Sequence, residues 1–533
     1  MWSGRIALVN PPTSIGAATY LAPPLGLAQV AAALERRRWG SQVDVLDLAL
    51  ELGEGALPVG PDLLAAATER LLASSYDIYA FSVQCFNLPI AAAIATRLKR
   101  AAPRAKIIFG GHHAGLAQDE IRACLSVDDV LGRSAEREIL GDDSFLLPPA
   151  LHKLPELSRY WALSPHPAGL VETGRGCPFD CSYCSIPAVF GRGSARKPVA
   201  TVMAEIAAWR QAGFNTVHLV DDTFTRSARQ LEPLLSALGD VGSDFAWTAM
   251  TRADLVNPAL LSCLGRSGCV GLLYGVDTGS PEALARLSKR AVRYPDIAEL
   301  ALWNVEAGIA PTFYFLIDLL RDTMHDLELS LAQAARASAV DPGSVRLNLV
   351  RIVPGTPLAR EAGYALHTNF EAPYADTLRA TVGDDCDEVW GLIARHPSVF
   401  STYFAAAAAT GRAPANALAR YGSDLIEAFP LTILEICSAR CMKPVLLGFT
   451  DRVGVARSLP AEQVKDAFAE AVDAVTEAGS EFLAYERWRA SGDAKRLSSR
   501  VDASSARRAA IVGVPTVRDT LLREPRLYQV AAA

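Results

Sequence analysis

The sequence of 533 residues has no apolar run close to the roughly 18 residues that suggest a membrane span. Its first residues, Met1 to Arg5, lack the basic and then apolar plan of a signal peptide. It also lacks a strong net charge, because 52 Lys and Arg residues nearly balance 58 Asp and Glu residues and leave −6. Nucleic-acid binding needs a concentrated basic face. We therefore expect a cytoplasmic protein with neither a nucleic-acid partner nor a membrane partner.

Cysteine is also sparse, and its ten copies do not have the dense pattern of a disulfide framework. We expect a reducing compartment, which would also protect an iron–sulfur cluster. Half of the residues are hydrophobic, so the chain can bury sizeable cores. A chain of this length predicts two or three domains.

Short apolar runs alternate with helical segments in residues 1–150, the first predicted domain. This alternation predicts an α/β fold with an open, doubly wound, Rossmann-like parallel sheet. The expected strands are 6–9, 43–46, 78–83, 106–109 and 129–131, with helices over 25–38 and 89–101. Ligands of such sheets lie beyond the carboxyl ends of the strands. Small and polar residues stand there, and we expect them to bind a cofactor: Asn10, Pro11, Ser82, Gln84, Gly110, Gly111, His112 and Gly132.

The same alternation returns in residues 165–365, the second predicted domain, and predicts a partial (β/α)6 barrel with its active site at the carboxyl ends of the strands. Its expected strands are 170–173, 216–220, 245–250, 271–276, 312–317 and 344–352. Residues 370–533, rich in alanine and charge, predict a mostly helical third domain with one strand at 444–449. Residues 141–168, rich in Pro and Leu, are the expected connection between the first two domains.

Three cysteines, Cys177, Cys181 and Cys184, follow the first expected barrel strand. At these spacings three thiolates can surround a cubane four-iron cluster. Such a cluster needs four ligands, so three would leave one iron open to a substrate or cofactor. A zinc site is one alternative, although it would be expected to close with a fourth Cys or His nearby, and the nearest following histidine is His218. Three unligated cysteines in a loop are the other alternative.

The Cys-x3-Cys-x2-Cys loop, with the aromatic Tyr183 before its last cysteine, resembles the radical S-adenosylmethionine (SAM) superfamily. The resemblance implies that the open iron chelates SAM, and that an electron from the cluster cleaves SAM to a radical that abstracts hydrogen from an unactivated carbon. It also implies that Asp222 approaches SAM and that Asp277 and Thr278 contact its ribose. Each Asp could instead cap a helix or a turn. Residues 316–323 depart from the family's Gly-x-Pro-Gly-Glu motif.

The first domain resembles the cobalamin-binding domain that precedes the radical SAM barrel in one large subgroup, which includes class B methyltransferases. The resemblance rests on residues 10–12, 23–27, the Ser82 loop, 110–112 and 132–136. The motif Asp-x-His-x-x-Gly, whose His coordinates cobalt, is missing, which implies cobalamin without a histidine lower ligand. As alternatives, the sheet binds nothing and His112 serves local backbone groups. Cys85 and the pair Cys437 and Cys441 are expected mainly to pack as small hydrophobic side chains.

The resemblance implies a cobalamin-dependent radical SAM C-methyltransferase that acts on an unactivated carbon in natural-product biosynthesis. It implies a [4Fe-4S] cluster, SAM and cobalamin as cofactors, a small-molecule or peptide substrate, and an electron donor such as flavodoxin or ferredoxin. One alternative is a cyclase, oxidase or rearrangement enzyme with the same cofactors. A methylthiotransferase would need an extra cluster-binding domain and a basic RNA-binding tail, and neither is seen in the sequence. A non-catalytic iron–sulfur or zinc regulatory protein is the alternative of another class.

Overall fold

The chain forms two compact units in the computed structural model. The first unit comprises residues 1–250, 266–269 and 351–406, and the second comprises 251–265, 270–350 and 407–533. The three domain ranges expected from the sequence stay predictions. The structure describes residues 2–13, 22–132, 134–141, 145–164, 167–289, 296–317, 322–341, 343–361, 373–404, 412–454, 459–476, 482–483 and 486–487.

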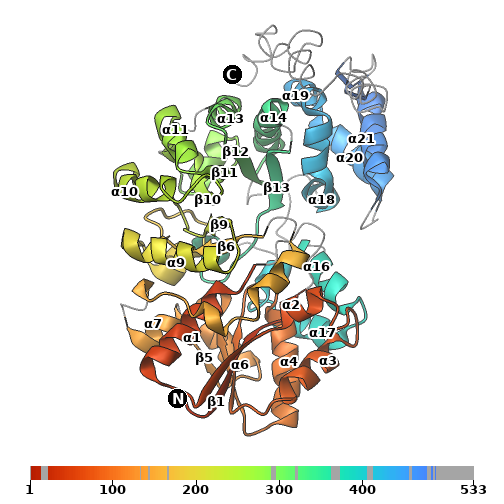
Figure 1. Cartoon of the computed structure of the whole chain (residues 1–533). Coiled ribbons are helices and arrows are strands. Elements are labelled where there is room, and N and C mark those ends of the chain that lie inside the picture. Colours follow the sequence, from red (N-terminus) through yellow and green to blue (C-terminus); the bar gives the residue numbers. More distant parts are fainter. Residues whose placement is uncertain are drawn as a thin grey trace. The chain divides into compact units, whose positions relative to one another are not determined.

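A five-stranded parallel sheet in the order β2-β1-β3-β4-β5 forms the first domain and confirms the doubly wound prediction. Helix α1 contacts α7 and α3 contacts α4, and Figure 1 shows these two pairs on opposite sides of the sheet. The elements are β1 (Arg5–Asn10), α1 (Leu25–Arg37), β2 (Gln42–Asp47), α2 (Leu48–Gly53), α3 (Leu63–Leu72), β3 (Ile78–Ser82), α4 (Leu88–Ala101), β4 (Lys106–Gly110), α5 (His112–Leu116), α6 (Gln118–Cys124), β5 (Asp129–Val130) and α7 (Ala135–Leu140).

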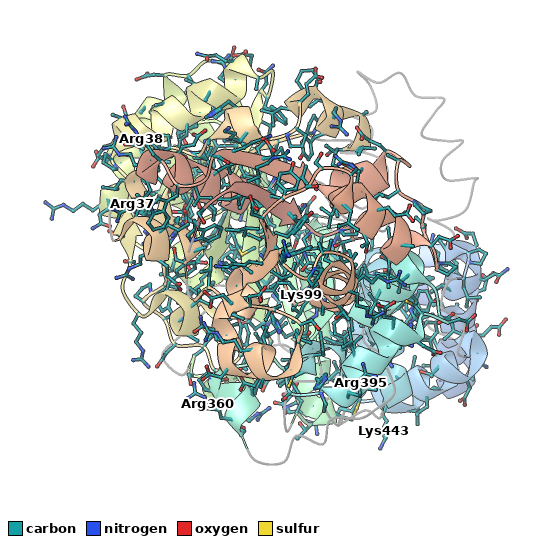
Figure 2. All side chains as sticks on the ribbon, turned by 90° about the horizontal axis from the view of Figure 1, so that it is seen from below. Arg37, Arg38, Lys99, Arg360, Arg395 and Lys443 are labelled. Carbon is teal, nitrogen blue, oxygen red and sulfur yellow. The ribbon has the colours of Figure 1, made fainter. Side chains whose placement is uncertain are left out.

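Burial explains why the apolar runs become strands. Residues 6–9 of β1 are all buried, as expected for a parallel strand that is covered on both faces. Helix α1 ends where Arg38 adopts a left-handed backbone conformation, and Arg36 and Arg37 occupy its last turn. Cations in the last turn interact favourably with the negative end of the helix dipole. Arg37 and Arg38 are labelled in Figure 2.

The expected connection between domains packs on the first sheet. Tyr160, in the 3-10 helix η3 (Leu157–Leu163), is buried and donates a hydrogen bond of 2.6 Å to Asp47 Oδ2. The other oxygen of Asp47 accepts from the backbone of Ala49 and Leu50 and caps α2. Burial raises the pKa of the Asp47 carboxyl, against these hydrogen bonds. Through Tyr160, the segment 145–164 therefore packs against the first domain.

All six expected barrel strands are present. In the first unit β6, β9 and β10 pair in that order, and in the second unit β11, β12 and β13 do the same, all in parallel. A short hairpin, β7 with β8, follows β6. The elements are β6 (Gly169–Val171), β7 (Gly174–Arg175), α8 (Ile186–Phe190), β8 (Ala195–Arg196), α9 (Val199–Gln211), β9 (Thr216–Leu219), α10 (Ala228–Gly239), β10 (Ala246–Arg252), α11 (Pro258–Arg266), β11 (Cys269–Asp277), α12 (Pro281–Arg286), α13 (Ile297–Glu306), β12 (Ala310–Ile317), α14 (Met324–Val340), β13 (Val345–Leu349) and α15 (Pro357–Arg360).

A segment distant in sequence completes the core of the first domain. Helices α16 (Pro373–Val382) and α17 (Asp387–Arg395) contact α3 and α4. Apolar residues of these helices and of the segment after them, from Ala375 to Phe404, share one hydrophobic cluster with the sheet. Arg97 on α4 donates to Glu388 at 2.8 and 3.0 Å. Residues 373–404 therefore pack on the first domain.

The rest of the described C-terminal region is helical, as predicted, with α18 (Arg412–Ala428), α19 (Pro430–Ser438), α20 (Met442–Val453) and α21 (Ala461–Val475). The expected strand at 444–449 is wrong, because these residues lie inside α20. Val445, Leu446 and Phe449 are buried at helical spacing, whereas Leu447 is 45% exposed. A short apolar run does not by itself distinguish a strand from a buried helix face. None of the described helices is long and apolar enough to cross a membrane.

Candidate cofactor site

A cavity of about 760 Å³ lies in the first unit, over the carboxyl ends of β1, β3 and β4. Its volume is within the range of ligand pockets, about 300–1,000 Å³. The strand order switches here, because β2 lies on one side of β1 and β3 lies on the other. Doubly wound sheets bind ligands at such a switch point. Seven of the residues predicted to bind a cofactor line it: Asn10, Ser82, Gln84, Gly110, Gly111, His112 and Asp222.

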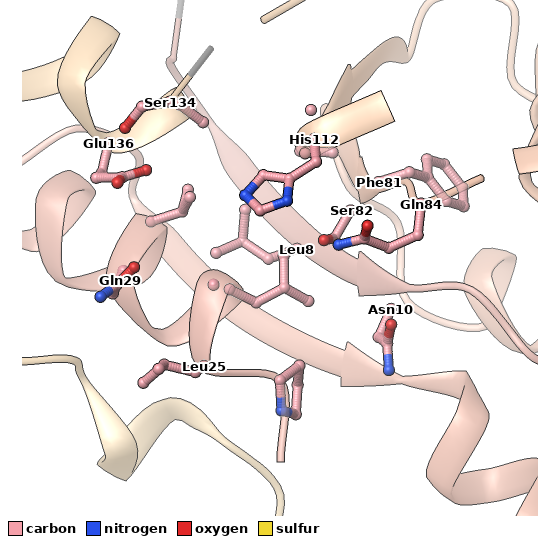
Figure 3. Close-up of a pocket in the computed structure, with 18 of the residues that line it drawn as sticks. Leu8, Asn10, Leu25, Gln29, Phe81, Ser82, Gln84, His112, Ser134 and Glu136 are labelled. Atoms are coloured by element: carbon pink, nitrogen blue, oxygen red, sulfur yellow. The ribbon is translucent and has the colours of Figure 1, made fainter. Parts of the chain in front are cut away.

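His112 projects into the middle of this cavity. Figure 3 shows its ring between Ser82 and Gln84 on one side and Ser134 and Glu136 on the other, with Leu8 below. It begins α5 directly after Gly111, whose φ of 104° suits glycine. A Cβ at Gly111 would stand 2.6 Å from the carbonyl oxygen of Val83, so the turn also needs glycine for space. Burial, with the positive charge of Arg175, lowers the pKa of His112, which favours the neutral imidazole.

Three other predicted residues, Pro11, Gly132 and Tyr183, are not among the residues that line the cavity. Pro11 is buried beyond β1, and its carbonyl accepts a hydrogen bond from Thr13. The Gly132 amide donates to Glu138 on α7. Tyr183 is half-buried in the cysteine loop. Their roles in cofactor binding stay predictions.

The three cysteines of residues 176–184, here called the cluster loop, approach one another in the first unit. Cys177 is buried, Cys181 and Cys184 are half-buried, and the Cys184 amide donates to the Cys181 carbonyl at 3.0 Å. Burial raises the pKa of Cys184 to about 12, and Cys181, Cys177 and Asp222 add to this effect. Metal binding deprotonates such thiols. The three thiols thus influence one another electrostatically in a loop that is largely shielded from water, which fits a shared cluster.

No group of three or more described His, Cys, Asp or Glu side chains has the arrangement of a single-ion site. A cubane cluster asks for something different, because each thiolate ligates a different iron and the sulfurs stand farther apart. All ten cysteines lie among the described residues, and none forms a disulfide. Ligation of a four-iron cluster by Cys177, Cys181 and Cys184 stays a prediction that this loop geometry fits.

Two carboxylates after β9 hold the start of the cluster loop. Asp221 accepts hydrogen bonds from the Thr173 amide at 2.7 Å, the Thr173 hydroxyl at 2.7 Å and the Gly174 amide at 2.9 Å. Asp222 accepts from the Gly176 amide at 2.9 Å and also lines the cavity. Burial raises the pKa of Asp222 to about 6, against that hydrogen bond. Asp222, predicted to approach SAM, is thus attached to the backbone next to Cys177.

We expect Asp221→Ala to reduce the iron that the protein retains after anaerobic reconstitution. The substitution would leave two buried amides without their acceptor, at a cost of about 1–3 kcal/mol each. Arg196 and Arg226 would lose a carboxylate 3.7 Å away. Asp180→Ala is the matched control, because Asp180 lies in the cluster loop itself but is half-exposed beside Arg192. Iron per chain and thermal unfolding are measured, and equal iron in Asp221→Ala and wild type would contradict this anchoring role.

Asp277 and Thr278, predicted to contact the ribose of SAM, lie in the second unit at the end of β11. Asp277 has a left-handed φ of 71° and forms a buried ion pair with Lys289. A non-glycine residue in this conformation is strained, and such strain is frequent at functional sites. Thr278 exchanges a hydrogen bond of 3.0 Å with Ser330 on α14. Neither is a helix cap, and both stay candidates. Residues 318–321 of the divergent motif lie outside the described residues.

A cluster of polar side chains in the cavity wall was not predicted from the sequence. Arg175, at the end of β7, contacts Glu172 from its own segment and Glu136 from α7. Gln29 on α1 and Ser134 complete the group. Arg175 lies two residues before Cys177, and Ser134 and Glu136 lie within residues 132–136, so the available signal was a position inside or beside a motif. Cys437 is buried in α19, as expected. Cys85 and Cys441 are only half-buried, so they pack less completely than expected.

Comparison with known families decides what the two sheets are. The family model for the B12 binding domain matches residues 13–140, and that for the radical SAM superfamily matches residues 171–334. This chain is a radical SAM protein with a preceding B12-binding domain. These two domains imply cobalamin, SAM and a [4Fe-4S] cluster as cofactors. The resemblance drawn from the cysteine loop and the first sheet is thereby confirmed.

Similar curated proteins include an uncharacterized methyltransferase of Pyrococcus horikoshii, 25% identical over 193 residues, 36% of this chain and 41% of that protein. A hopanoid C-2 methylase of Rhodopseudomonas palustris is 24% identical over 222 residues, 40% of each chain. The tryptophan 2-C-methyltransferase of Streptomyces laurentii is 26% identical over 141 residues, 25% of this chain and 24% of that protein. The chain thus spans less than half the length of these relatives.

Two solved structures share the fold. TsrM of Kitasatospora setae, a radical SAM methyltransferase with cobalamin and a [4Fe-4S] cluster bound, matches with a TM-score of 0.54 at 16% identity, over 82% of this chain and 99% of that chain. OxsB, a cobalamin-dependent radical SAM enzyme with aqua-cobalamin bound, matches with 0.53 at 13% identity, over 91% and 83%. At this identity the likeness shows the fold alone.

Proposed function

We propose that the protein is a cobalamin-dependent radical SAM C-methyltransferase. One observation carries the proposal. A single cavity is lined by Ser82 and His112 of the B12-binding domain and by Arg175 and Asp222, which adjoin the cluster loop. Residues next to both predicted cofactors therefore face the same space. A reaction that needs both cofactors together requires such proximity.

When bound, the cofactors would supply a radical that removes hydrogen from carbon and a methyl group that replaces it. The chain's own contribution is to hold and enclose. Asp221 and Asp222 hold the backbone before Cys177. Gly110 and Gly111 have no side chains that would fill the cavity. Buried apolar side chains such as Leu8 and Ile108 also line it. The dry wall limits the access of water to reactive species.

The proposed substrate is a small molecule or a peptide, and the proposed setting is natural-product biosynthesis in the cytoplasm. The names of similar proteins support the first point, since they act on a hopanoid, on tryptophan and on a cytidylyl phosphonate. An electron donor such as flavodoxin or ferredoxin would reduce the cluster. The absence of nucleic-acid and membrane partners remains part of the proposal.

Transfer of a labelled methyl group tests the proposal. Reduced, fully loaded protein is given SAM with a deuterated methyl group and a panel of tryptophan, a hopanoid and a cytidylyl phosphonate. We expect one substrate class to gain the labelled methyl on carbon, with 5′-deoxyadenosine and S-adenosylhomocysteine in roughly equal amounts. The protein lacking all three cluster cysteines is the control. A substrate consumed with 5′-deoxyadenosine release but no added methyl would favour the cyclase or oxidase alternative.

A further inference from the structure

The guanidinium of Arg175 joins two parts of the cavity wall. Its Nε and Nη2 donate to the two carboxylate oxygens of Glu172, each at 2.8 Å. Its Nη1 donates to Glu136 and, at 3.2 Å, to Ser134 Oγ. Nη2 also reaches Gln29 Oε1 at 3.3 Å. We call this group, Arg175 with Glu172, Glu136, Ser134 and Gln29, the Arg175 clamp.

The clamp is built in a dry place. The side chains of Arg175, Glu172 and Glu136 are only 14%, 13% and 9% exposed. The rings of Phe145 and Phe190 cover the guanidinium at 5.1 and 5.2 Å. Charge-assisted hydrogen bonds are stronger where water is excluded, and the bidentate pairing with Glu172 fixes the plane of the guanidinium. Arg175 therefore has one well-defined orientation.

The two ends of the clamp belong to the two cofactor domains. Arg175 lies directly before Gly176 and Cys177, and its backbone pairs with β8. Glu136 and Ser134 lie at the start of α7, and Gln29 lies on α1, both in the B12-binding domain. All five residues line the cavity, and Figure 3 shows Gln29, Ser134 and Glu136 on one side of His112. A shift of α7 would thus pull on the residue next to the cluster loop.

We propose that Arg175 is a positioning residue that sets the distance between the corrin and the iron–sulfur cluster by fastening the start of α7 to the cluster loop. This inference rests on the two cofactors of the proposed function. Glu172 orients the guanidinium from the cluster side, and Glu136 receives it on the corrin side. Lysine cannot replace it, because an ammonium group lacks the planar fork that serves two carboxylates at once.

Magnetic interaction between the reduced cluster and cob(II)alamin tests the inference without any substrate. Both centres are paramagnetic, so electron paramagnetic resonance reports their separation. The experiment uses full-length protein loaded with both cofactors, as wild type, Arg175→Met and Arg175→Lys. We expect one defined dipolar splitting in wild type, and loss of the resolved splitting in both variants. Arg192→Met, which removes an exposed ion pair with Asp180 of the cluster loop, is the matched control and should keep the wild-type spectrum.

A second readout separates positioning from simple damage. Iron content should stay at the wild-type level in Arg175→Met, because Asp221 and Asp222 still hold the backbone before Cys177. Glu136→Gln keeps the pairing with Glu172 and weakens only the corrin-side contact, so it should also broaden the splitting. It serves if Arg175→Met does not fold.

The outcomes distinguish this inference from the function on which it rests. A wild-type splitting in a folded Arg175→Met protein, or in Glu136→Gln if that is the variant that folds, overturns the clamp alone. Loss of iron from the variant also overturns it, because that loss indicates a merely structural role. No interaction between the cofactors in the wild type contradicts the proposed function, and the clamp with it.

Discussion

Replacement of Cys177, Cys181 and Cys184 together by Ala is expected to abolish iron–sulfur cluster binding. Thiolates are the normal ligands of a four-iron cluster, and the other polar groups near this loop already have partners, as Asp221 and Asp222 show. Wild-type protein reconstituted without oxygen should hold about four irons per chain. The triple variant should hold none and should release no 5′-deoxyadenosine.

Iron analysis, visible absorbance and SAM cleavage measure this result. Cys124→Ala is the matched control, because Cys124 is a half-buried cysteine at the end of α6 in the same unit. It should keep the wild-type iron content. If the triple variant retained the iron and the absorbance of the wild type, the assignment of the cluster to this loop would be wrong. Zinc in place of iron in the wild type would favour the zinc alternative.

Gly26→Trp is expected to prevent cobalamin binding without unfolding the protein. Gly26 is the second residue of α1 and lines the cavity, and a Cβ there meets nothing within 4 Å. We expect the indole ring to occupy part of the volume that a corrin would need. Affinity should fall by about 10²-fold or more, which corresponds to about 3 kcal/mol.

Corrin absorbance after desalting measures the Gly26 prediction, with thermal unfolding beside it. Gly26→Ala is the control, because it adds one methyl group that meets nothing within 4 Å. It should bind cobalamin as the wild type does. Equal corrin retention in Gly26→Trp would show that the corrin lies elsewhere. Iron content should be unchanged in both variants, because the substitution lies on the other domain.

The sheet and barrel strands were predictable because their signals are local. Residues 6–9 and 78–82 are short apolar runs bounded by polar or turn residues, and burial on both faces of a parallel sheet requires that composition. The expected strand at 444–449 had the same apolar content and failed. Pro444 and the residues after it occupy the first turns of α20, where a helix buries Val445 and Phe449 on one face. Composition over six residues does not choose between those outcomes.

Residues 373–404 show a second limit. Their alanine and charged residues indicated helices, and α16 and α17 formed. Nothing local indicated that these helices would pack on α3 and α4 rather than on one another. The Nε2 of the buried His113 lies 2.8 Å from the Val399 carbonyl oxygen. This contact between residues 286 positions apart is part of that packing. A contact at such separation depends on the path of the whole chain.

By itself, the sequence determined which chemistry the protein can hold. Three cysteines at spacings of four and three, and small residues at the ends of successive strands, are patterns that local geometry converts directly into a cluster loop and a ligand-binding sheet edge. Only the tertiary structure decided which side chains share the cavity. Arg175 meets Glu136 across 39 residues, and Asp221 meets Thr173 across 48. Side-chain period encodes burial along one element, whereas such pairs form only once separate elements are packed together.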